Sequence, residues 1–130
     1  MNCRIPPVEE RPNPKYLVGA ALVTKVLVAG GGGFIGGHLV GSLLADGHEV
    51  RAVDQKPTGQ WYQVHDGAEN LVADLQQKES CVGAVAGVDQ VYNLAADMGG
   101  MGFIENNKAL CMLSVLINTH LLQAANDGGV

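Results

Sequence analysis

A run of eight residues near the start of the chain is rich enough in glycine to bind a phosphate. This stretch, GGGGFIGG at 30–37, follows a short apolar run and precedes a helical pattern. Gly31, Gly33 and Gly36 fit GxGxxG, whereas Gly30, Gly33 and Gly36 fit GxxGxxG. In either spacing the glycines allow a sharp turn, a close approach of backbone to a pyrophosphate, and tight packing of helix on strand. Because the motif lies between a strand and a helix, we favour a dinucleotide-phosphate site over a merely flexible turn.

Two acidic residues follow later strands and could contact the adenosine part of a dinucleotide. Asp54 ends the second apolar run, at about the distance from the glycines where a carboxylate accepts the ribose hydroxyls. Its charge repels a 2′-phosphate, which favours NAD over NADP, although Arg51 and Lys56 are nearby cations that oppose this preference. Asp74 either contacts the adenine edge, beside Leu75, or caps the helix that follows it.

A second glycine cluster, AADMGGMG at 95–102, follows the fourth predicted strand. In a doubly wound sheet of order 3-2-1-4, strands one and four are neighbours and their crossovers leave on opposite faces. The loops beyond their carboxyl ends then flank a crevice, so the second cluster should face the first across it. Ala95 and Ala96 would form a flat floor against the cofactor. Asp97 has two interpretations, a ligand contact or a turn residue.

Alternating strand and helix patterns must position these clusters. The sequence predicts strands at 24–30, 48–54, 68–75 and 87–96, helices at 34–47, 76–86 and 104–126, and a polar loop at 55–67. This alternation predicts an α/β fold, a partial Rossmann domain with a doubly wound parallel sheet that is truncated before the fifth strand. Residues 1–22 are expected to be a poorly ordered leader, and 23–130 the NAD-binding domain.

Composition excludes several other classes of function. The net charge of −5 gives no electrostatic case for nucleic acid or an anionic membrane surface. The apolar segment 16–28 is short and interrupted by Lys25, so no membrane span is expected. The odd count of three cysteines argues against a disulfide framework and favours a reducing, cytoplasmic location. The four histidines lack metal-binding spacing, so no metal site is expected.

These motifs, taken together, carry a family resemblance. GGGGFIGGHL (30–39), Asp54, ADL (73–75) and NLAA (93–96), in this order, resemble the extended short-chain dehydrogenase/reductase family, the NAD-dependent sugar-nucleotide epimerases and dehydratases. The resemblance covers 24–130. NLAADMGGMGFI, at 93–104, is similar more specifically to the members that act on GDP-mannose, which implies a nucleotide-sugar substrate of that type and an isomerase activity. Ala29 departs from the family, which often has threonine there.

The resemblance also implies which residues would hold each ligand. For NAD it implies Gly30, Gly33, Phe34, Ile35 and Gly36 around the phosphates, Asp54 at the ribose, Asp74 and Leu75 near adenine, and Ala95 and Ala96 against the cofactor. For the nucleotide sugar it implies Gly99, Gly100 and Met101. The last helix is expected to contribute to a homodimer in the full-length protein.

The family's catalytic Tyr-x-x-x-Lys is missing from the chain. The residues four positions after Tyr16, Tyr62 and Tyr92 are Ala20, Asp66 and Ala96. We therefore expect a cofactor-binding fragment of an epimerase that is inactive by itself, and assign no catalytic residue. Two alternatives remain open. One is a non-catalytic NAD-binding module, and the other is a different family member, such as a 4-epimerase or a 4,6-dehydratase.

Overall fold

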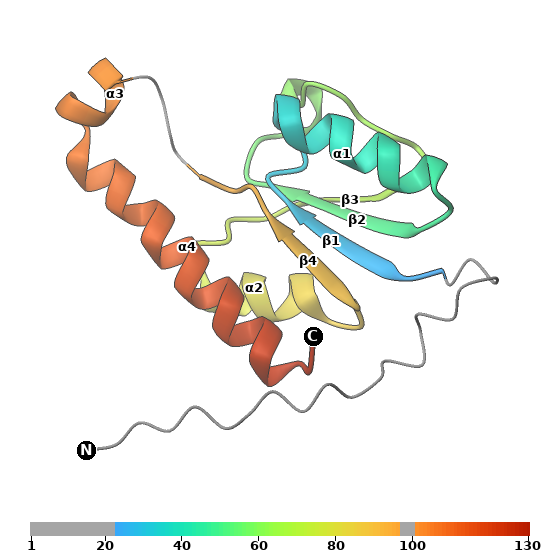
Figure 1. Cartoon of the computed structure of the whole chain (residues 1–130). Coiled ribbons are helices and arrows are strands. Elements are labelled where there is room, and N and C mark those ends of the chain that lie inside the picture. The colour runs from blue at the N-terminus through green and yellow to red at the C-terminus, as the bar shows by residue number, and fades with distance from the viewer. Residues whose placement is uncertain (1–22, 97–100) are drawn as a thin grey trace.

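The computed structural model describes residues 23–96 and 101–130, and the predicted leader at 1–22 lies outside them. The described chain forms a parallel four-stranded sheet of order β3-β2-β1-β4 (Figure 1). Its strands are β1 (Lys25–Ala29), β2 (Glu49–Asp54), β3 (Glu69–Val72) and β4 (Gln90–Asn93). The predicted fold class and strand order are confirmed. Each strand lies within the predicted range but is shorter.

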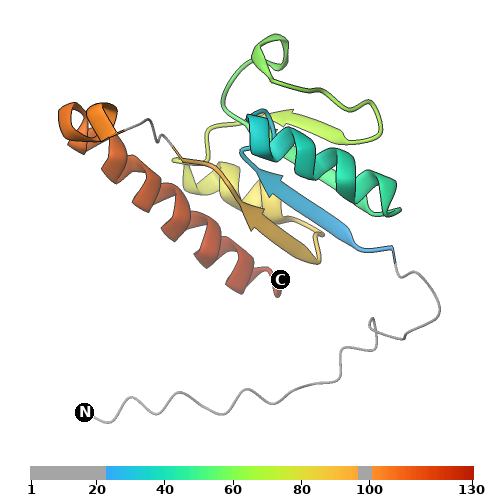
Figure 2. The same ribbon diagram turned by 45° about the horizontal axis from the view of Figure 1, so that its top comes forward.

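Helices cover both faces of the sheet, as a doubly wound fold requires (Figures 1 and 2). They are α1 (Phe34–Ala45), the short 3₁₀ helix η1 (Thr58–Gln60), α2 (Lys78–Val85), α3 (Met101–Asn106) and α4 (Lys108–Asp127). Gly47, with φ +85°, follows the end of α1 where the sequence predicts a stop. The prediction of a single helix at 104–126 is wrong, because the structure has two helices there. Asn107, with φ −129° and ψ 42°, separates α3 from α4.

Alternate side chains of β1 enter two separate hydrophobic layers. Val26 and Val28 pack with α1 and Trp61 on one face of the sheet. Leu27 and Ala29 pack on the other face with the buried residues of α2 and α4. All four side chains are fully buried, because a central strand of a doubly wound sheet is covered on both sides. The chain segments that follow β1 and β4 therefore leave on opposite faces, as predicted.

One buried charge joins the sheet to α2. Arg51, on β2, is 8% exposed, and its Nη1 donates to the carbonyl oxygens of Ala84 (2.7 Å) and Ala86 (2.9 Å) at the end of α2. Its Nε donates to Glu69 Oε2 at 2.8 Å, and Lys25 Nζ lies 3.5 Å from the same oxygen. Arg51 thus satisfies carbonyl groups that a helix end leaves without partners. These hydrogen bonds offset the desolvation cost of burying its charge.

α4 extends beyond the sheet that it covers (Figures 1 and 2). Its buried residues, Ile117, Leu121 and Ala124, lie from the middle of the helix onward. Among the described helices, α4 is the one whose length and mean hydropathy, 1.2, would suffice to cross a membrane. Because its second half packs into the core with β1 and α2, we interpret it as a helix of the domain.

Glu69 should make the stability of the domain depend on acid pH. The hydrogen bond from Arg51, with the charges of Arg51 and Lys25, lowers the pKa of Glu69 against an opposing effect of burial. Because the folded-state pKa lies below the unfolded value, ionised Glu69 stabilises the fold above the unfolded pKa, about 4.3, and this contribution is lost as the pH falls through the folded value. In urea unfolding, the free energy of unfolding of wild type should exceed that of Glu69→Gln, and the difference should be largest at neutral pH. A difference that persists unchanged to about pH 3 would contradict this.

Candidate dinucleotide site

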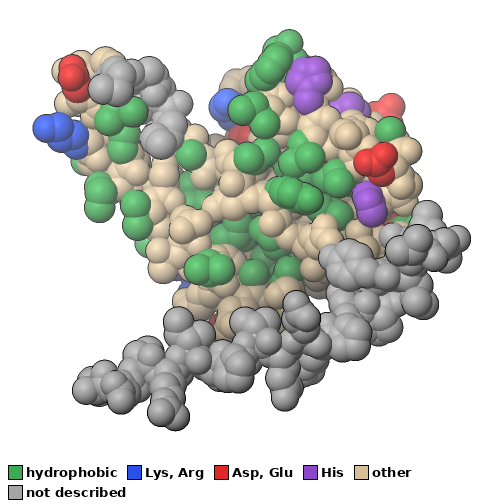
Figure 3. All heavy atoms as spheres, in the orientation of Figure 1, with side chains coloured by type: hydrophobic (Ala, Val, Ile, Leu, Met, Phe, Trp, Pro, Cys, Tyr) green, Lys and Arg blue, Asp and Glu red, His purple; other side chains and the backbone are tan. Residues whose placement is uncertain are grey.

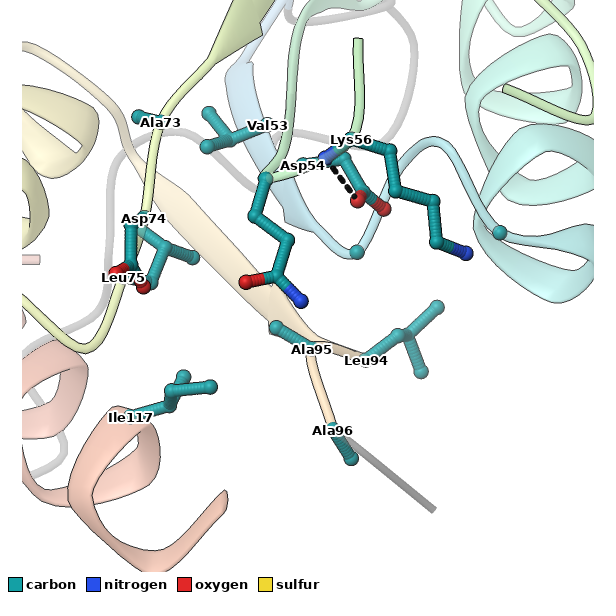
Figure 4. A pocket seen from close by; sticks show the side chains of 13 residues that line it. Val53, Asp54, Lys56, Ala73, Asp74, Leu75, Leu94, Ala95, Ala96 and Ile117 are labelled. Carbon is teal, nitrogen blue, oxygen red and sulfur yellow. Dashed lines mark hydrogen bonds between the residues drawn. The ribbon is translucent and has the colours of Figure 1, made fainter. Parts of the chain in front are cut away.

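A cavity opens at the carboxyl ends of the four strands (Figure 4). Seven of the predicted cofactor residues line it, namely Gly30, Gly33, Asp54, Asp74, Leu75, Ala95 and Ala96. They come from the turn after β1, the end of β2, the segment after β3 and the segment after β4. Ligands of open α/β sheets bind at this edge.

The turn from β1 into α1 depends on Gly30. Its φ of +80° lies in the left-handed region, and its N–H donates to Val53 O at 2.8 Å. A Cβ on Gly30 would lie 2.7 Å from the backbone carbonyl of Leu94 and 2.9 Å from the nitrogen of Ala95. The turn is therefore in direct backbone contact with the segment after β4. Of the two spacings that the sequence leaves open, this geometry favours GxxGxxG, starting at Gly30.

Gly36 has a packing role instead of a place in the cavity wall. A Cβ on Gly36 would collide with the carbonyl oxygen of Gly30 and lie 2.9 Å from the α-carbon of Gly31. The absence of a side chain lets the first turn of α1 lie directly on the preceding loop. This is the third function expected of the glycine motif, close packing of helix against strand.

The start of α1 leaves backbone donors for an anion. Gly33 is the N-cap residue and lines the cavity, and its N–H donates to Gly30 O at 3.1 Å. Within the described residues, the N–H groups of Phe34 and Ile35 have no hydrogen-bond acceptor, as expected for the first turn of a helix. Their side chains are 58% and 68% exposed and do not line the cavity. Any contact that they make with a phosphate is therefore through the backbone.

Asp54 is held at the edge of the cavity by two backbone groups. Its Oδ2 accepts from Gly32 N–H (3.2 Å) and its Oδ1 from Lys56 N–H (3.1 Å). Each carboxylate oxygen keeps a free lone pair for a ligand hydroxyl. Of the two cations that oppose an NAD preference, Arg51 is committed to Glu69 and α2. The side chain of Lys56 lines the cavity beside Asp54 (Figure 4).

Asp74 lines the cavity but does not cap α2. The N-cap residue of α2 is Gln77, which makes no side-chain capping bond. Instead, Asp74 Oδ1 accepts from Gln76 N–H at 2.9 Å, in a local turn. The capping interpretation is wrong because the helix begins four residues after Asp74, and the adenine contact stays a prediction.

Cys81 lies beneath this turn. Burial, with a smaller effect of the Asp74 charge, raises the pKa of its thiol.

The segment after β4 closes the cavity on the other side. Leu94 N–H donates to Ala29 O at 2.9 Å, and Asn93 Nδ2 donates to Asn118 Oδ1 on α4 at 3.2 Å. These bonds place Ala95 and Ala96 in the cavity wall. Of the predicted substrate residues, Gly99 and Gly100 lie outside the described residues, as does Asp97. Met101 begins α3.

Sequence reasoning missed six of the lining residues. These are Val53, Gln55, Lys56, Ala73, Leu94 and Ile117. Four of them are chain neighbours of predicted site residues, and Lys56, which the sequence indicates only as a cation near Asp54, lies two residues after it, so the ends of the strands were the available signal. Ile117 comes from α4, and its place in an apolar helical stripe indicated only a core position.

Among residues 23–96 and 101–130, no group of His, Cys, Asp or Glu is arranged to hold a metal ion.

Two helical glycines should respond oppositely to alanine. Gly36→Ala should lower the unfolding midpoint and weaken dinucleotide binding, because its Cβ meets backbone that cannot move without opening the turn. Gly83→Ala, in the middle of α2, has no atom within 4 Å of its Cβ and should stabilise the domain by about 1 kcal/mol through helix propensity. Thermal and urea unfolding of both variants measure this. An unchanged midpoint for Gly36→Ala would refute the packing role.

The chain is similar to known proteins along most of its length. The model of the "NAD dependent epimerase/dehydratase family" matches residues 26–130. GDP-mannose 3,5-epimerase 1 of Oryza sativa subsp. japonica is 38% identical over 107 residues, 82% of this chain and 28% of the rice protein. A 3-beta-hydroxysteroid dehydrogenase of Mycolicibacterium neoaurum is 34% identical over 110 residues, 82% of this chain and 30% of that protein.

A solved structure shows the same arrangement. UDP-glucose 4-epimerase of Thermus thermophilus, in complex with NAD, superposes with a TM-score of 0.72 and 32% identity over 82% of this chain and 35% of that one. The chain thus spans less than a third of the curated relatives described above. Because the family model covers most of the sequence, the chain belongs to the NAD dependent epimerase/dehydratase family.

Proposed function

We propose that this chain is the NAD-binding part of a sugar-nucleotide epimerase of the GDP-mannose 3,5-epimerase type. The observation that carries the proposal is the cavity in which Gly33 at the start of α1, Asp54 at the end of β2 and Ala95 after β4 meet. A helix start, a ribose-binding carboxylate and a small-residue floor are the features that a dinucleotide needs.

The residues present fit NAD. Gly30 and Gly33 line the cavity without side chains, so a pyrophosphate could approach their backbone. The N–H groups of Phe34 and Ile35 would donate to it, and Asp54 would accept from the ribose hydroxyls. When bound, NAD supplies a hydride acceptor and donor. The chain's own residues bind and orient it and exclude water along the Ala95 and Ala96 wall.

The substrate assignment has separate support. Identity to the rice GDP-mannose 3,5-epimerase, 38% over 107 residues, exceeds that to the steroid dehydrogenase, 34% over 110 residues. The stretch 93–104 is the part that resembles enzymes acting on GDP-mannose. We therefore propose that a nucleotide sugar binds beyond β4, to the residues that the resemblance implies, Gly99, Gly100 and Met101. A cytoplasmic location accords with these small-molecule ligands.

A non-catalytic NAD-binding module is the second candidate. Within these 130 residues, which span less than a third of the curated relatives, none of the three tyrosines is followed four residues later by lysine. A tyrosine with a neighbouring lysine is the acid–base pair by which the family moves a hydroxyl proton. We propose that the 130-residue chain binds NAD but does not turn over GDP-mannose by itself. Turnover by the purified chain would exclude the module and overturn this part of the proposal.

Cofactor choice tests the role of Asp54. Calorimetric titration should show NAD binding more tightly than NADP, because the Asp54 carboxylate accepts ribose hydroxyls and repels a 2′-phosphate. Asp54→Asn should weaken NAD binding about tenfold to a hundredfold, the range for a hydrogen bond to a charged group. Asp66→Asn removes the same charge from an exposed position outside the cavity and should leave binding unchanged. Equal affinities of wild type for NAD and NADP would contradict the assignment.

We propose further that the protein forms a homodimer through α4. Met112, Val115, Leu116 and Leu122 recur three, four or seven residues apart on α4 and are 38% to 68% exposed. Figure 3 shows hydrophobic side chains on the surface of α4. A face of this kind on one helix fits a second copy of itself in a two-fold helical interface.

Charge on the exposed face of α4 should weaken self-association. Replacing both Met112 and Val115 by glutamate should raise the dimer dissociation constant about tenfold or more, because two apolar contacts are lost and like charges face each other. Sedimentation equilibrium measures it. Val82→Glu, at an equally exposed valine of α2, is the control and should leave the constant unchanged. A wild-type chain that stays monomeric at high concentration would refute the dimer.

A further inference from the structure

The loop between β2 and β3 contains a tryptophan for which the sequence offers two interpretations, a cover over the adenosine side or, preferably, an apolar cluster. Trp61, the only tryptophan of the sequence, is 7% exposed and belongs to the hydrophobic layer beneath α1. It does not line the cavity. Its contacts nevertheless lead to the cavity, through two residues that flank Asp54.

The first contact is with Gly32. A Cβ on Gly32 would lie 2.7 Å from Cγ and 2.8 Å from Cδ1 of the indole, so the ring lies directly against the α-carbon of Gly32. The carbonyl oxygen of Gly32 accepts from Tyr62 N–H at 2.9 Å. Its N–H donates to Asp54 Oδ2 at 3.2 Å. The peptide groups around Gly32 are thus fixed by the ring and by a hydrogen bond from the residue next to Trp61.

The second contact is with Lys56. The indole Nε1 donates to the carbonyl oxygen of Lys56 at 2.7 Å. The N–H of the same residue donates to Asp54 Oδ1 at 3.1 Å. η1 closes the intervening segment, with Gln60 N–H bonded to Pro57 O at 2.8 Å. Trp61 therefore fixes the position of the loop that carries the second donor to Asp54.

We infer that Trp61 is a positioning residue for the Asp54 carboxylate and thereby sets the preference for NAD over NADP. The two backbone groups that hold the carboxylate oxygens, one each, belong to the two residues that the indole contacts. A carboxylate fixed before binding loses less conformational freedom when it accepts two ribose hydroxyls. It also cannot turn away from a 2′-phosphate. This inference rests on the proposed function, since it assumes that NAD occupies the cavity.

The test compares the affinities for NAD and NADP in matched variants of the full chain. Trp61→Phe keeps an aromatic ring beneath Gly32 but removes the donor to Lys56. Titration calorimetry should show NAD binding weakened roughly threefold to tenfold, the range of one neutral hydrogen bond. NADP binding should weaken less, so that the ratio of the two dissociation constants narrows. A purely structural residue would lower both affinities alike.

Two further variants separate positioning from packing. Val50→Ala removes volume from the same hydrophobic layer at the opposite end of β2. It should lower the unfolding midpoint and leave the NAD/NADP ratio unchanged. Should Trp61→Phe fold poorly, benzothienylalanine at position 61 keeps the shape of the indole and lacks its N–H, and it should narrow the ratio in the same way.

The outcomes distinguish the inference from the function on which it rests. If wild type binds NAD and the ratio is unchanged in both Trp61 variants, Trp61 does not position Asp54 and the inference is wrong, while the proposed function stands. If the ratio narrows in Val50→Ala as well, the effect is one of stability and the inference again fails. If wild type binds neither NAD nor NADP, the proposed function itself is overturned.

Discussion

The turn between β1 and α1 has no space for side chains, and the rest of the site depends on this steric constraint. A Cβ would meet the backbone of Leu94 at Gly30, the side chain of Ala52 at Gly31, the indole of Trp61 at Gly32 and the carbonyl of Gly30 at Gly36. Each approach comes from a different part of the domain. The turn is therefore the point at which β2, the segment after β4, the β2–β3 loop and α1 are brought into contact. The start of α1 is aimed at the cavity as a consequence.

The two cations near Asp54 illustrate how position decides the role of a charge. Arg51 and Asp54 are both on β2, three residues apart, so their side chains leave on opposite faces of the strand. Arg51 is buried against the end of α2, where carbonyl oxygens and Glu69 surround its guanidinium. Lys56 lies beyond the strand, where its stem can reach the cavity. In the proposed site, one cation, Lys56, therefore counters the repulsion between Asp54 and a 2′-phosphate. The loop that Trp61 fixes determines where Lys56 lies.

Sequence reasoning succeeded where the determinant is local. The β-branched run of β1, the helical pattern after Gly33 and the position of Asp54 at a strand end fixed the sheet order and most of the cavity wall. It was incomplete where the determinant is distant in sequence or lies in local backbone geometry. Trp61 is buried because Gly32, some thirty residues earlier, has no side chain, and Arg51 is tolerated because α2 ends beside it. The break at Asn107 and the start of α2 after Gln77 depend on local backbone choices that a hydrophobic period does not record.

The similarity to both a GDP-mannose epimerase and a steroid dehydrogenase follows from the physical organisation of this segment. Nearly all the described cavity residues lie at the ends of β1, β2 and β3 or just after β4. The ligand contacts that we propose for them involve the backbone, ribose hydroxyls and phosphate charge. Such contacts are indifferent to whether a sugar or a sterol is oxidised. Substrate choice must then depend on groups that approach the redox end of the cofactor. Within the described residues, α4 contacts the end of β4 through Asn118 and the cavity through Ile117. An apolar helix that a core prediction would treat as packing thus also lines the cavity.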